Sequence, residues 1–198
     1  MLLHERLKDY NIILGSASPR RRQLLADCDF QFTVAEKFEC DETFPATMPA
    51  SQVASFLSQT KSNAYPLKLS EKDILITADT VVIVDNQILG KPKDASDAFA
   101  MLSLLNNRAH VVTTGVTIRS ASNTHTFSVD STVRFRKLTD EEITYYIEKY
   151  RPFDKAGSYG IQEWIGYAAI EGIEGSFFNV MGLPVQRLYT ELQSFISH

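Results

Sequence analysis

The run from Ile74 to Val84, ILITADTVVIV, constrains the fold of this chain more than any other segment. Successive residues of a strand point to opposite faces, and here both alternating sets are largely apolar. Such a strand needs cover on both faces, so the run predicts a central strand of a sheet. Asp85 and Asn86 are predicted to form a two-residue turn, from which Ile88 and Leu89 return the chain as a hairpin.

Asp79 is the charged exception in the middle of this strand. A buried carboxylate without a partner costs roughly several kcal/mol, so the strand must deliver Asp79 to a cation, a metal ion or a wet cleft. The alternative is a structural aspartate satisfied by backbone amides or by one arginine. The hairpin should also bring Lys91, in the sequence Gly-Lys-Pro, back near Asp79. Both residues are therefore candidates for a functional site.

The segment NIILGSASPRRRQLL, residues 11–25, predicts a buried strand that turns directly into a helix. Residues 11–14 are a short, mostly apolar run, and Gly15 interrupts it. Ser18 followed by Pro19 is typical of a helix start, with serine at the N-cap and proline at the first helical position. The helix should therefore begin at Pro19.

Three arginines, residues 20–22, occupy the first turn of this helix, where the helix dipole and the free amide groups disfavour a cation. Arg21 falls nearest the apolar face that contains Leu24 and Leu25, so it should lean inward. A bound anion would resolve both conflicts, because free amides and guanidinium groups together form a phosphate site. The alternative is a solvated basic turn. On the dipole argument alone, removing Arg21 should weaken phosphate binding and leave the fold at least as stable.

The remaining patterns indicate a mixed α/β protein. Strands are expected over Phe30–Ala35, His110–Ser120 and Thr124–Lys137, and helices over Pro49–Tyr65, after Asp94 as far as Leu105, from Thr139 to about Tyr150, and across Val185, Leu188, Leu192 and Phe195. Two glycine-rich segments, residues 154–162 and 175–184, also occur, and glycines let the backbone approach a ligand closely.

Composition limits the possible partners. The chain has 20 Lys and Arg against 24 Asp and Glu, so its net charge of −4 argues against a general nucleic-acid binder and requires any basic site to be local. Cys28 and Cys40 have neither zinc nor redox spacing, which favours a reducing compartment. The charged N-terminus is not typical of a signal peptide, and no segment approaches the roughly 18 apolar residues of a membrane span. We therefore expect a cytoplasmic protein without a membrane partner.

Five motifs follow one another along the chain: SASPRRRQLL at 16–25, ADTVV at 78–82, GKP at 90–92, DKAGSYGIQ at 154–162 and GSFFNVMGLP at 175–184. In this order and spacing they resemble the Maf family of nucleoside triphosphate pyrophosphatases, from about Asn11 to Leu188. The Tyr-Gly-Ile-Gln ending of the fourth motif is similar to the branch that acts on dTTP and UTP, and unlike the branch that acts on 7-methyl-GTP. Two departures are the extension at residues 1–10 and Glu163-Trp164, where the family is often glycine-rich.

The resemblance implies an α/β fold like that of the inosine triphosphate pyrophosphatases. The expected architecture is an elongated, twisted mixed sheet with surrounding helices and two lobes around a central cleft, in one domain over residues 1–198. The resemblance also implies that Asp79 is the proton acceptor and that Arg20, Thr80 and Gln162 determine substrate specificity. It further implies a divalent metal and places Ser16, Arg21, Glu42, Lys61, Lys91 and Lys155 at other polar positions of the cleft. From their chemistry we expect phosphate binding by Ser16, Arg20, Arg21, Lys61, Lys91 and Lys155, and metal binding by Asp79 and Glu42.

The implied reaction is attack by water on the α-phosphorus of dTTP or UTP, which yields the nucleoside monophosphate and pyrophosphate. The sequence has no HExxH, no CxxC and no histidine cluster, so an oxygen-bound Mg²⁺ or Mn²⁺ suits it better than zinc. Two alternatives stay open: an enzyme of the same fold for a methylated or deaminated purine nucleotide, and a non-enzymatic cell-division regulator that binds nucleic acid or a partner through the arginine turn. A two-fold homodimer is the default expectation for assembly.

Overall fold

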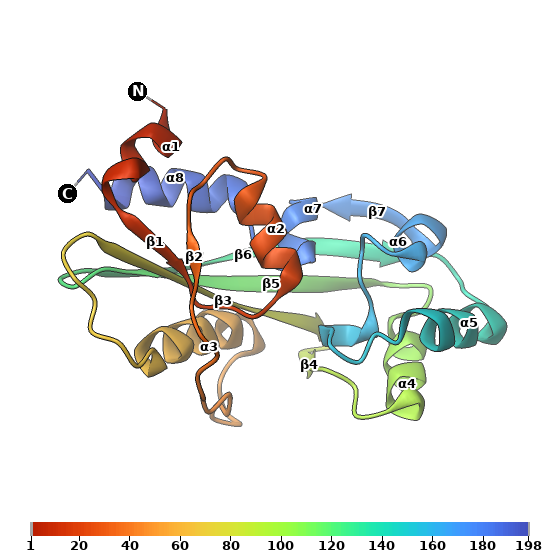
Figure 1. The fold of residues 1–198 in the computed structure, drawn as a ribbon. Helices are drawn as coiled ribbons and strands as arrows, with labels where there is room; N and C mark the ends of the chain where they lie inside the picture. Colours follow the sequence, from red (N-terminus) through yellow and green to blue (C-terminus); the bar gives the residue numbers. More distant parts are fainter. Residues whose placement is uncertain (1, 198) are drawn as a thin grey trace.

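A computed structural model describes residues 2–197 and is organised around one mixed sheet (Figure 1). Across those residues the sheet has seven strands in the order β2-β1-β3-β5-β6-β7, with β4 paired to the end of β3. The strands are β1 Asn11–Leu14, β2 Thr33–Val34, β3 Asp73–Val84, β4 Gln87–Leu89, β5 Ala109–Arg119, β6 Thr124–Phe135 and β7 Ile170–Glu174. β1 is parallel to β2 and β3, and the other pairs are antiparallel. The predicted mixed α/β fold is confirmed.

β3 is a central strand of the sheet, as predicted from the apolar residues on both of its faces. On one side β5 pairs with it from Leu75 to Ile83. On the other side the pairing with β1 ends at Ile76, and the pairing with β4 begins only at Val82. Within residues 2–197, no strand covers the stretch of β3 between these two pairs. Asp79 lies in this open stretch, so the sheet itself leaves room for a cleft beside it.

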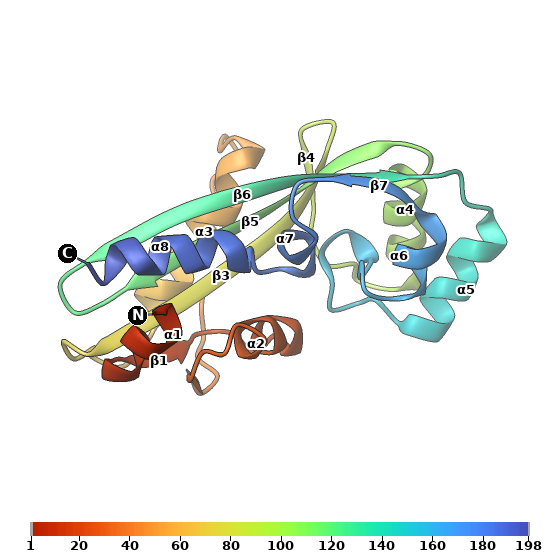
Figure 2. The same cartoon turned by 90° about the horizontal axis from the view of Figure 1, so that it is seen from above.

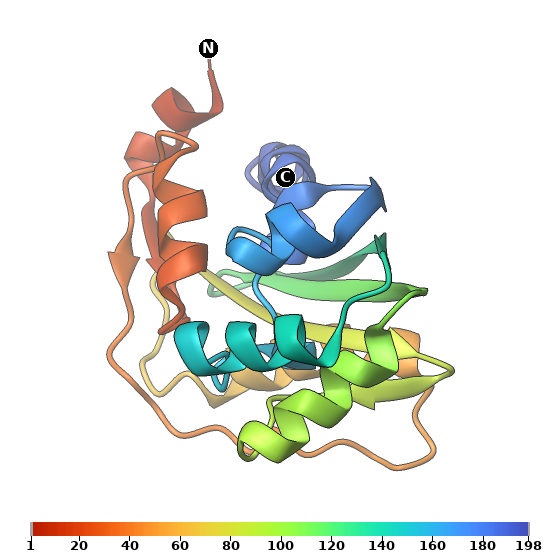
Figure 3. The same ribbon diagram turned by 90° about the vertical axis from the view of Figure 1, so that its right-hand side faces the viewer.

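Helices cover both faces of the sheet, with α8 along one face and α3 along the other (Figures 1 and 3). The helices are α1 Leu3–Arg6, α2 Pro19–Ala26, α3 Ala50–Ala64, α4 Ala95–Leu105, α5 Asp140–Tyr150, α6 Trp164–Ala169, α7 Phe177–Met181 and α8 Val185–Phe195, with short 3₁₀ turns η1 Leu7–Asp9 and η2 Ala156–Ser158. No helix in the described range 2–197 has the length and apolar character needed to cross a membrane.

The boundary between two large hydrophobic clusters lies in the middle of β3. One joins β1, α2 and α8 and includes Ala78, whereas the other joins α4, α5 and α6 and includes Val82. Figure 2 shows this arrangement, with β1 and α8 along one half of the long strands and α4, α5 and α6 at the other end. Asp79 therefore lies between two lobes, as the sequence led us to expect.

Gly115 lets α3 approach the sheet at the level of Asp79. It pairs with Asp79 across β5 and β3, and a Cβ atom on it would lie 2.3 Å from the carbonyl carbon and oxygen of Ala54 in α3. Only a residue without a side chain allows a helix backbone to come this close. This packing places the last turn of α3, which carries Lys61, beside β3.

The local signals read from the sequence are confirmed. Ser18 caps α2 by accepting a hydrogen bond from the backbone N–H of Arg21 at 3.4 Å, and α2 begins at Pro19. Thr139 forms the predicted capping box at the start of α5. Asp85 and Asn86 have φ angles of 49° and 59°, which fit the tight turn between β3 and β4.

Other expectations need correction. The strand expected over Phe30–Ala35 is reduced to Thr33–Val34, because β1 provides only Ile13 and Leu14 as partners. α6, β7 and α7 form in segments for which the sequence pattern predicts no helix or strand. The extension also has a structural place: Leu3 and Leu7 are buried in the cluster that contains α8.

Candidate active site

A cleft of about 750 Å³ opens beside the uncovered stretch of β3. The β1–α2 turn, the loop before α3, the residues after β4 and the loop at residues 154–162 form its walls. Every site residue predicted from the sequence lines the cleft, either on these walls or on β3 and α3: Ser16, Arg20, Arg21, Glu42, Lys61, Asp79, Thr80, Lys91, Lys155 and Gln162. Segments far apart in the sequence therefore converge on one cleft.

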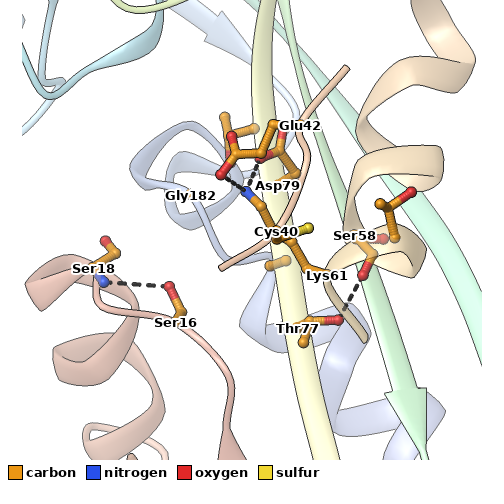
Figure 4. Close-up of polar contacts among 12 residues, drawn as sticks. Ser16, Ser18, Cys40, Glu42, Ser58, Lys61, Thr77, Asp79 and Gly182 are labelled. Atoms are coloured by element: carbon orange, nitrogen blue, oxygen red, sulfur yellow. Dashed lines mark hydrogen bonds and ion pairs between the residues drawn. The ribbon is translucent and has the colours of Figure 1, made fainter. Parts of the chain in front are cut away.

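The ammonium group of Lys61 lies between two carboxylates in the cleft (Figure 4). Lys61 Nζ donates a hydrogen bond to Asp79 Oδ1 and forms an ion pair with Glu42 Oε1 at 3.3 Å. The side chains of Lys61 and Asp79 are 16% and 11% exposed, whereas that of Glu42 is half exposed. A lysine thus provides the cation that the buried Asp79 carboxylate requires.

The same two carboxylates are the oxygen donors available for a divalent ion. Within residues 2–197, no group of three or more His, Cys, Asp or Glu side chains is arranged to hold a metal. Asp79 and Glu42 nevertheless converge on one point, which the Lys61 ammonium occupies. Hard cations such as Mg²⁺ take oxygen ligands and commonly complete their shell with substrate phosphates and water. The donor set fits such an ion when a nucleotide contributes oxygens and Lys61 moves aside.

A chain of ion pairs connects α2 with the 154–162 loop. Arg20 Nη1 contacts Asp154 Oδ2 at 3.2 Å, and Lys155 Nζ contacts Asp154 Oδ1 at 2.7 Å and Glu163 Oε1 at 3.1 Å. Partial burial raises the pKa of Asp154, but the hydrogen bonds from Lys155 and Arg20 outweigh it, so the net shift is downward. Lys155 is buried between two carboxylates, whereas Arg20 has one exposed partner. Arg20 is therefore the easier of the two to transfer to an incoming anion.

Arg21 leans inward as predicted, and protein groups occupy its guanidinium. Its Nε donates to the carbonyl of Gly182 at 2.7 Å, and its Nη1 donates to the carbonyl of Ala78 at 2.9 Å and to Ser16 Oγ at 3.3 Å. Its Nη2 donates to Thr80 Oγ1 at 3.1 Å. Burial lowers the pKa of Arg21, and the nearby Asp79 opposes that shift. This arginine joins α2, the open edge of β3 and the end of α7, so the structure reverses the expectation that its removal leaves the fold at least as stable.

Thr80 belongs to a buried network that continues from Arg21. Its hydroxyl lies 2.8 Å from the hydroxyl of Thr114, which donates to the carbonyl of Asn179 at 3.0 Å. The Asn179 side chain in turn donates to the carbonyl of Val112 and to Ser131 Oγ, each at 3.0 Å. The network ties β3 and β5 to α7, and it engages the Thr80 hydroxyl on more than one side.

Gln162 ends the 154–162 loop and contributes to the cleft wall. Its Oε1 atom is buried and has no hydrogen-bond partner among residues 2–197. The loop is held at Tyr159, whose hydroxyl lies 2.7 Å from His110 Nε2 of β5. Burial lowers the pKa of His110 to about 4, so its imidazole is neutral near pH 7. Gln162 thus offers an unused acceptor on an anchored loop.

Sequence reasoning missed the residues that hold these groups in place. Thr114 and His110 gave no signal, because threonine is common in strands and a single histidine is ordinary in a core. Asn179 did give a usable signal, since an amide between the apolar residues of GSFFNVMGLP needs buried partners. Tyr146 and Glu163, which contact each other beside the loop that carries Gln162, were also missed.

The Maf-like protein family model matches residues 11–195 of the chain. A dTTP/UTP pyrophosphatase of Porphyromonas gingivalis is 52% identical over 193 residues, covering 96% of this chain and 97% of that protein. A protein of the same name from Parabacteroides distasonis is 48% identical over 191 residues, covering 96% of this chain and 99% of that protein. Another from Flavobacterium johnsoniae is 45% identical over 196 residues, covering 98% and 100%.

The fold is also similar to a solved structure. The Staphylococcus aureus Ham1 protein superposes with a TM-score of 0.54 at 14% identity, covering 93% of this chain and 98% of that chain. At this identity the likeness concerns the fold alone. The motifs, the converging cleft and the near full-length relatives together establish that this chain belongs to the Maf family.

Proposed function

We propose that this protein is a nucleoside triphosphate pyrophosphatase that hydrolyses dTTP and UTP to the nucleoside monophosphate and pyrophosphate. The observation that carries the proposal is the position of Lys61 between Asp79 and Glu42 in a cleft that also contains Arg20 and Lys91. The names of the full-length relatives support the same activity.

The proposed chemistry uses Asp79 as the proton acceptor. A water molecule beside its carboxylate would lose a proton to it while attacking the α-phosphorus, and pyrophosphate would leave. Lys61, displaced from between the two carboxylates, would then bind a phosphate group and compensate part of its charge. Arg20 and the exposed Lys91 would bind the outer phosphates, and the Ser16 hydroxyl could donate a hydrogen bond to one of them. Positioning and charge neutralisation should dominate the rate.

A divalent cation, Mg²⁺ or Mn²⁺, is part of the proposal. Asp79 and Glu42 would hold it together with phosphate oxygens, and when bound it would supply charge neutralisation at the phosphates. Lys155 is a weaker candidate for phosphate binding than the sequence suggested, because Asp154 and Glu163 already compensate its charge.

Base selection is assigned to Gln162. Uracil and thymine present an imide N–H between two carbonyl groups. Gln162 lines the cleft, and its Oε1 atom, which is buried and without a protein partner among residues 2–197, would accept from that N–H after the side-chain amide turns toward the base. Cytosine has an acceptor at the same ring position, so an amide held in one orientation would reject it. Thr80 would act indirectly, because its hydroxyl is engaged by Arg21 and Thr114.

A panel of nucleoside triphosphates tests the proposal. We expect monophosphate and pyrophosphate from dTTP and UTP in the presence of Mg²⁺ or Mn²⁺, and less product from CTP, GTP and methylated or deaminated purine nucleotides. A chelator should abolish the activity, and added metal should restore it. A preference for any purine triphosphate would contradict the assignment. DNA binding with steep salt dependence and no pyrophosphate release would instead favour a nucleic-acid regulator.

Assembly and location remain part of the proposal. We expect a two-fold homodimer, because two-fold dimers are the commonest assembly. We expect no nucleic-acid partner, because the net charge is −4. A cytoplasmic location without a membrane partner is also part of the proposal. A molar mass measured in solution by light scattering would decide the oligomeric state.

A further inference from the structure

One tyrosine hydroxyl contacts both ends of the turn that carries Gln162. Tyr146, on α5, is fully buried, and its hydroxyl accepts a hydrogen bond from the backbone N–H of Gly160 at 3.0 Å. The same hydroxyl donates to Glu163 Oε2. Gly160 and Glu163 are the first and fourth residues of the turn, and Gln162 lies between them.

The turn is closed in two further ways. The backbone N–H of Glu163 donates to the carbonyl of Gly160 at 3.0 Å. The other carboxylate oxygen of Glu163 faces Lys155 Nζ at 3.1 Å, at the start of the same loop. The Glu163 side chain is 18% exposed, and among the described residues it is not one that lines the cleft.

The hydroxyl has the protonation state that this arrangement needs. Burial raises the pKa of Tyr146, and the neighbouring Glu163 carboxylate raises it further. Tyr146 therefore remains a neutral phenol at any ordinary pH. It can donate to Glu163 and accept from Gly160 at the same time.

We propose that Tyr146 and Glu163 are positioning residues for base recognition, holding the Gly160–Glu163 turn so that the Gln162 amide faces the nucleotide base in one orientation. This inference rests on the proposed function. It adds that the selectivity of Gln162 depends on contacts between the turn and Tyr146 of α5. Neither residue touches the substrate. Both act through the backbone and side chain of the turn.

Tyr146→Phe is the sharpest variant, because it removes one oxygen atom and keeps the aromatic packing. With UTP and CTP as substrates, we expect the ratio of their kcat/KM values to fall about tenfold, the loss of one well-placed hydrogen bond at a buried site. The effect should appear mainly as a higher KM for UTP. The change in kcat should be smaller, because Asp79 and Lys61 belong to other elements.

The matched control is Tyr150→Phe, one helical turn further along α5. Tyr150 stacks on Tyr146 with ring centroids 5.2 Å apart, and no hydrogen bond of its hydroxyl is found within residues 2–197. Tyr150→Phe removes the same atom from the same helix, but the hydroxyl that is lost has no hydrogen-bond partner among those residues. This variant should therefore leave the ratio of the kcat/KM values for UTP and CTP unchanged. Melting temperatures of both variants separate a loss of positioning from a loss of stability.

Two substitutions of Glu163 test the second half of the support. Glu163→Ala should lower the ratio of the kcat/KM values for UTP and CTP, as Tyr146→Phe does. Glu163→Gln keeps an oxygen that can accept from Tyr146 and should recover most of the selectivity, although the charge facing Lys155 is lost. A purely structural role would lower the melting temperature of these variants and leave the ratio of the folded enzyme unchanged.

The proposal is overturned if folded Tyr146→Phe keeps the wild-type ratio within about twofold, or if Glu163→Gln is no better than Glu163→Ala. Failure of the proposed function would show separately, in the wild-type enzyme, as a preference for another nucleotide. In that case we would measure, for the same variants, the ratio of kcat/KM for the preferred nucleotide to kcat/KM for UTP. A smaller ratio in the variants than in the wild type would support the positioning proposal, and an unchanged ratio would contradict it.

Discussion

Asp79→Asn tests the proposed chemistry most directly. Asparagine is close in shape to aspartate, and its Oδ1 atom can still accept a hydrogen bond from Lys61 Nζ. Glu42, 3.3 Å from that nitrogen, continues to compensate the ammonium charge. The substitution therefore leaves no buried charge without a partner, and the variant should fold.

Asp79→Asn should have a small effect on stability and a large effect on turnover. Replacing the Lys61–Asp79 ion pair by a hydrogen bond from the Lys61 ammonium to a neutral amide oxygen should lower the free energy of unfolding by about 1–3 kcal/mol. That is less than the stability of a typical domain, about 5–15 kcal/mol. Turnover should fall about 10²- to 10⁴-fold, because the amide cannot accept a proton from water. Such a fall raises the activation barrier by about 2.7–5.4 kcal/mol.

The assay measures pyrophosphate release from saturating UTP together with unfolding in urea. Asp73→Asn serves as the control, because Asp73 lies at the start of the same strand but hydrogen-bonds to Ser70 and Asn11 outside the cleft. It should keep wild-type turnover. If folded Asp79→Asn retains turnover within about tenfold of wild type, Asp79 is not the proton acceptor and the reasoning from its position is refuted.

Three further predictions follow from the same geometry. Arg21→Lys should lower the free energy of unfolding by about 1–3 kcal/mol, because lysine cannot reproduce the guanidinium fork, and an unchanged value in urea unfolding would contradict the structural role of Arg21. Gln162→Ala should reduce the preference for UTP over CTP in kcat/KM by roughly ten- to a hundredfold, whereas an equal loss on both nucleotides would show that Gln162 does not contact the base. The pKa of His110 is lowered to about 4 by burial, so the stability it contributes is complete above its unfolded pKa of about 6.5 and is lost as the pH falls from there toward 4. Melting curves of His110→Phe should therefore depend less on pH between about 7 and 5 than those of the wild type.

The sequence predicted well those features that depend on neighbouring residues. The cap at Ser18, the capping box at Thr139 and the turn at Asp85 each involve contacts within about four positions, so local side-chain chemistry decides them. β3 was predictable for a related reason, since two apolar faces require cover wherever the strand lies. The short elements α6, β7 and α7 have too few residues for a periodic pattern, and β7 forms because the edge of β6 offers a partner.

The candidate residues of the site were named from sequence motifs, but their partners were decided by the tertiary structure. The sequence indicated that Asp79 needs a cation, and only the packing of α3 on Gly115 determined that this cation is Lys61. The inward lean of Arg21 was predicted from helix periodicity. Its binding to the carbonyl of Gly182, 161 residues away, follows from the place where β1 ends and leaves the edge of β3 open.

The sequence by itself determined which residues carry charge, where the helices and turns begin, and that a carboxylate lies inside a central strand. Only the tertiary structure decided which charges compensate one another and which polar groups remain free, as Gln162 Oε1 does within the described residues. The physical reason is range: capping and strand burial are set by a few neighbouring residues, whereas ion pairs and shared hydroxyl groups depend on how distant elements pack. At that second level Lys155 and Arg21 gain protein partners, and our proposals about both residues rest on those contacts.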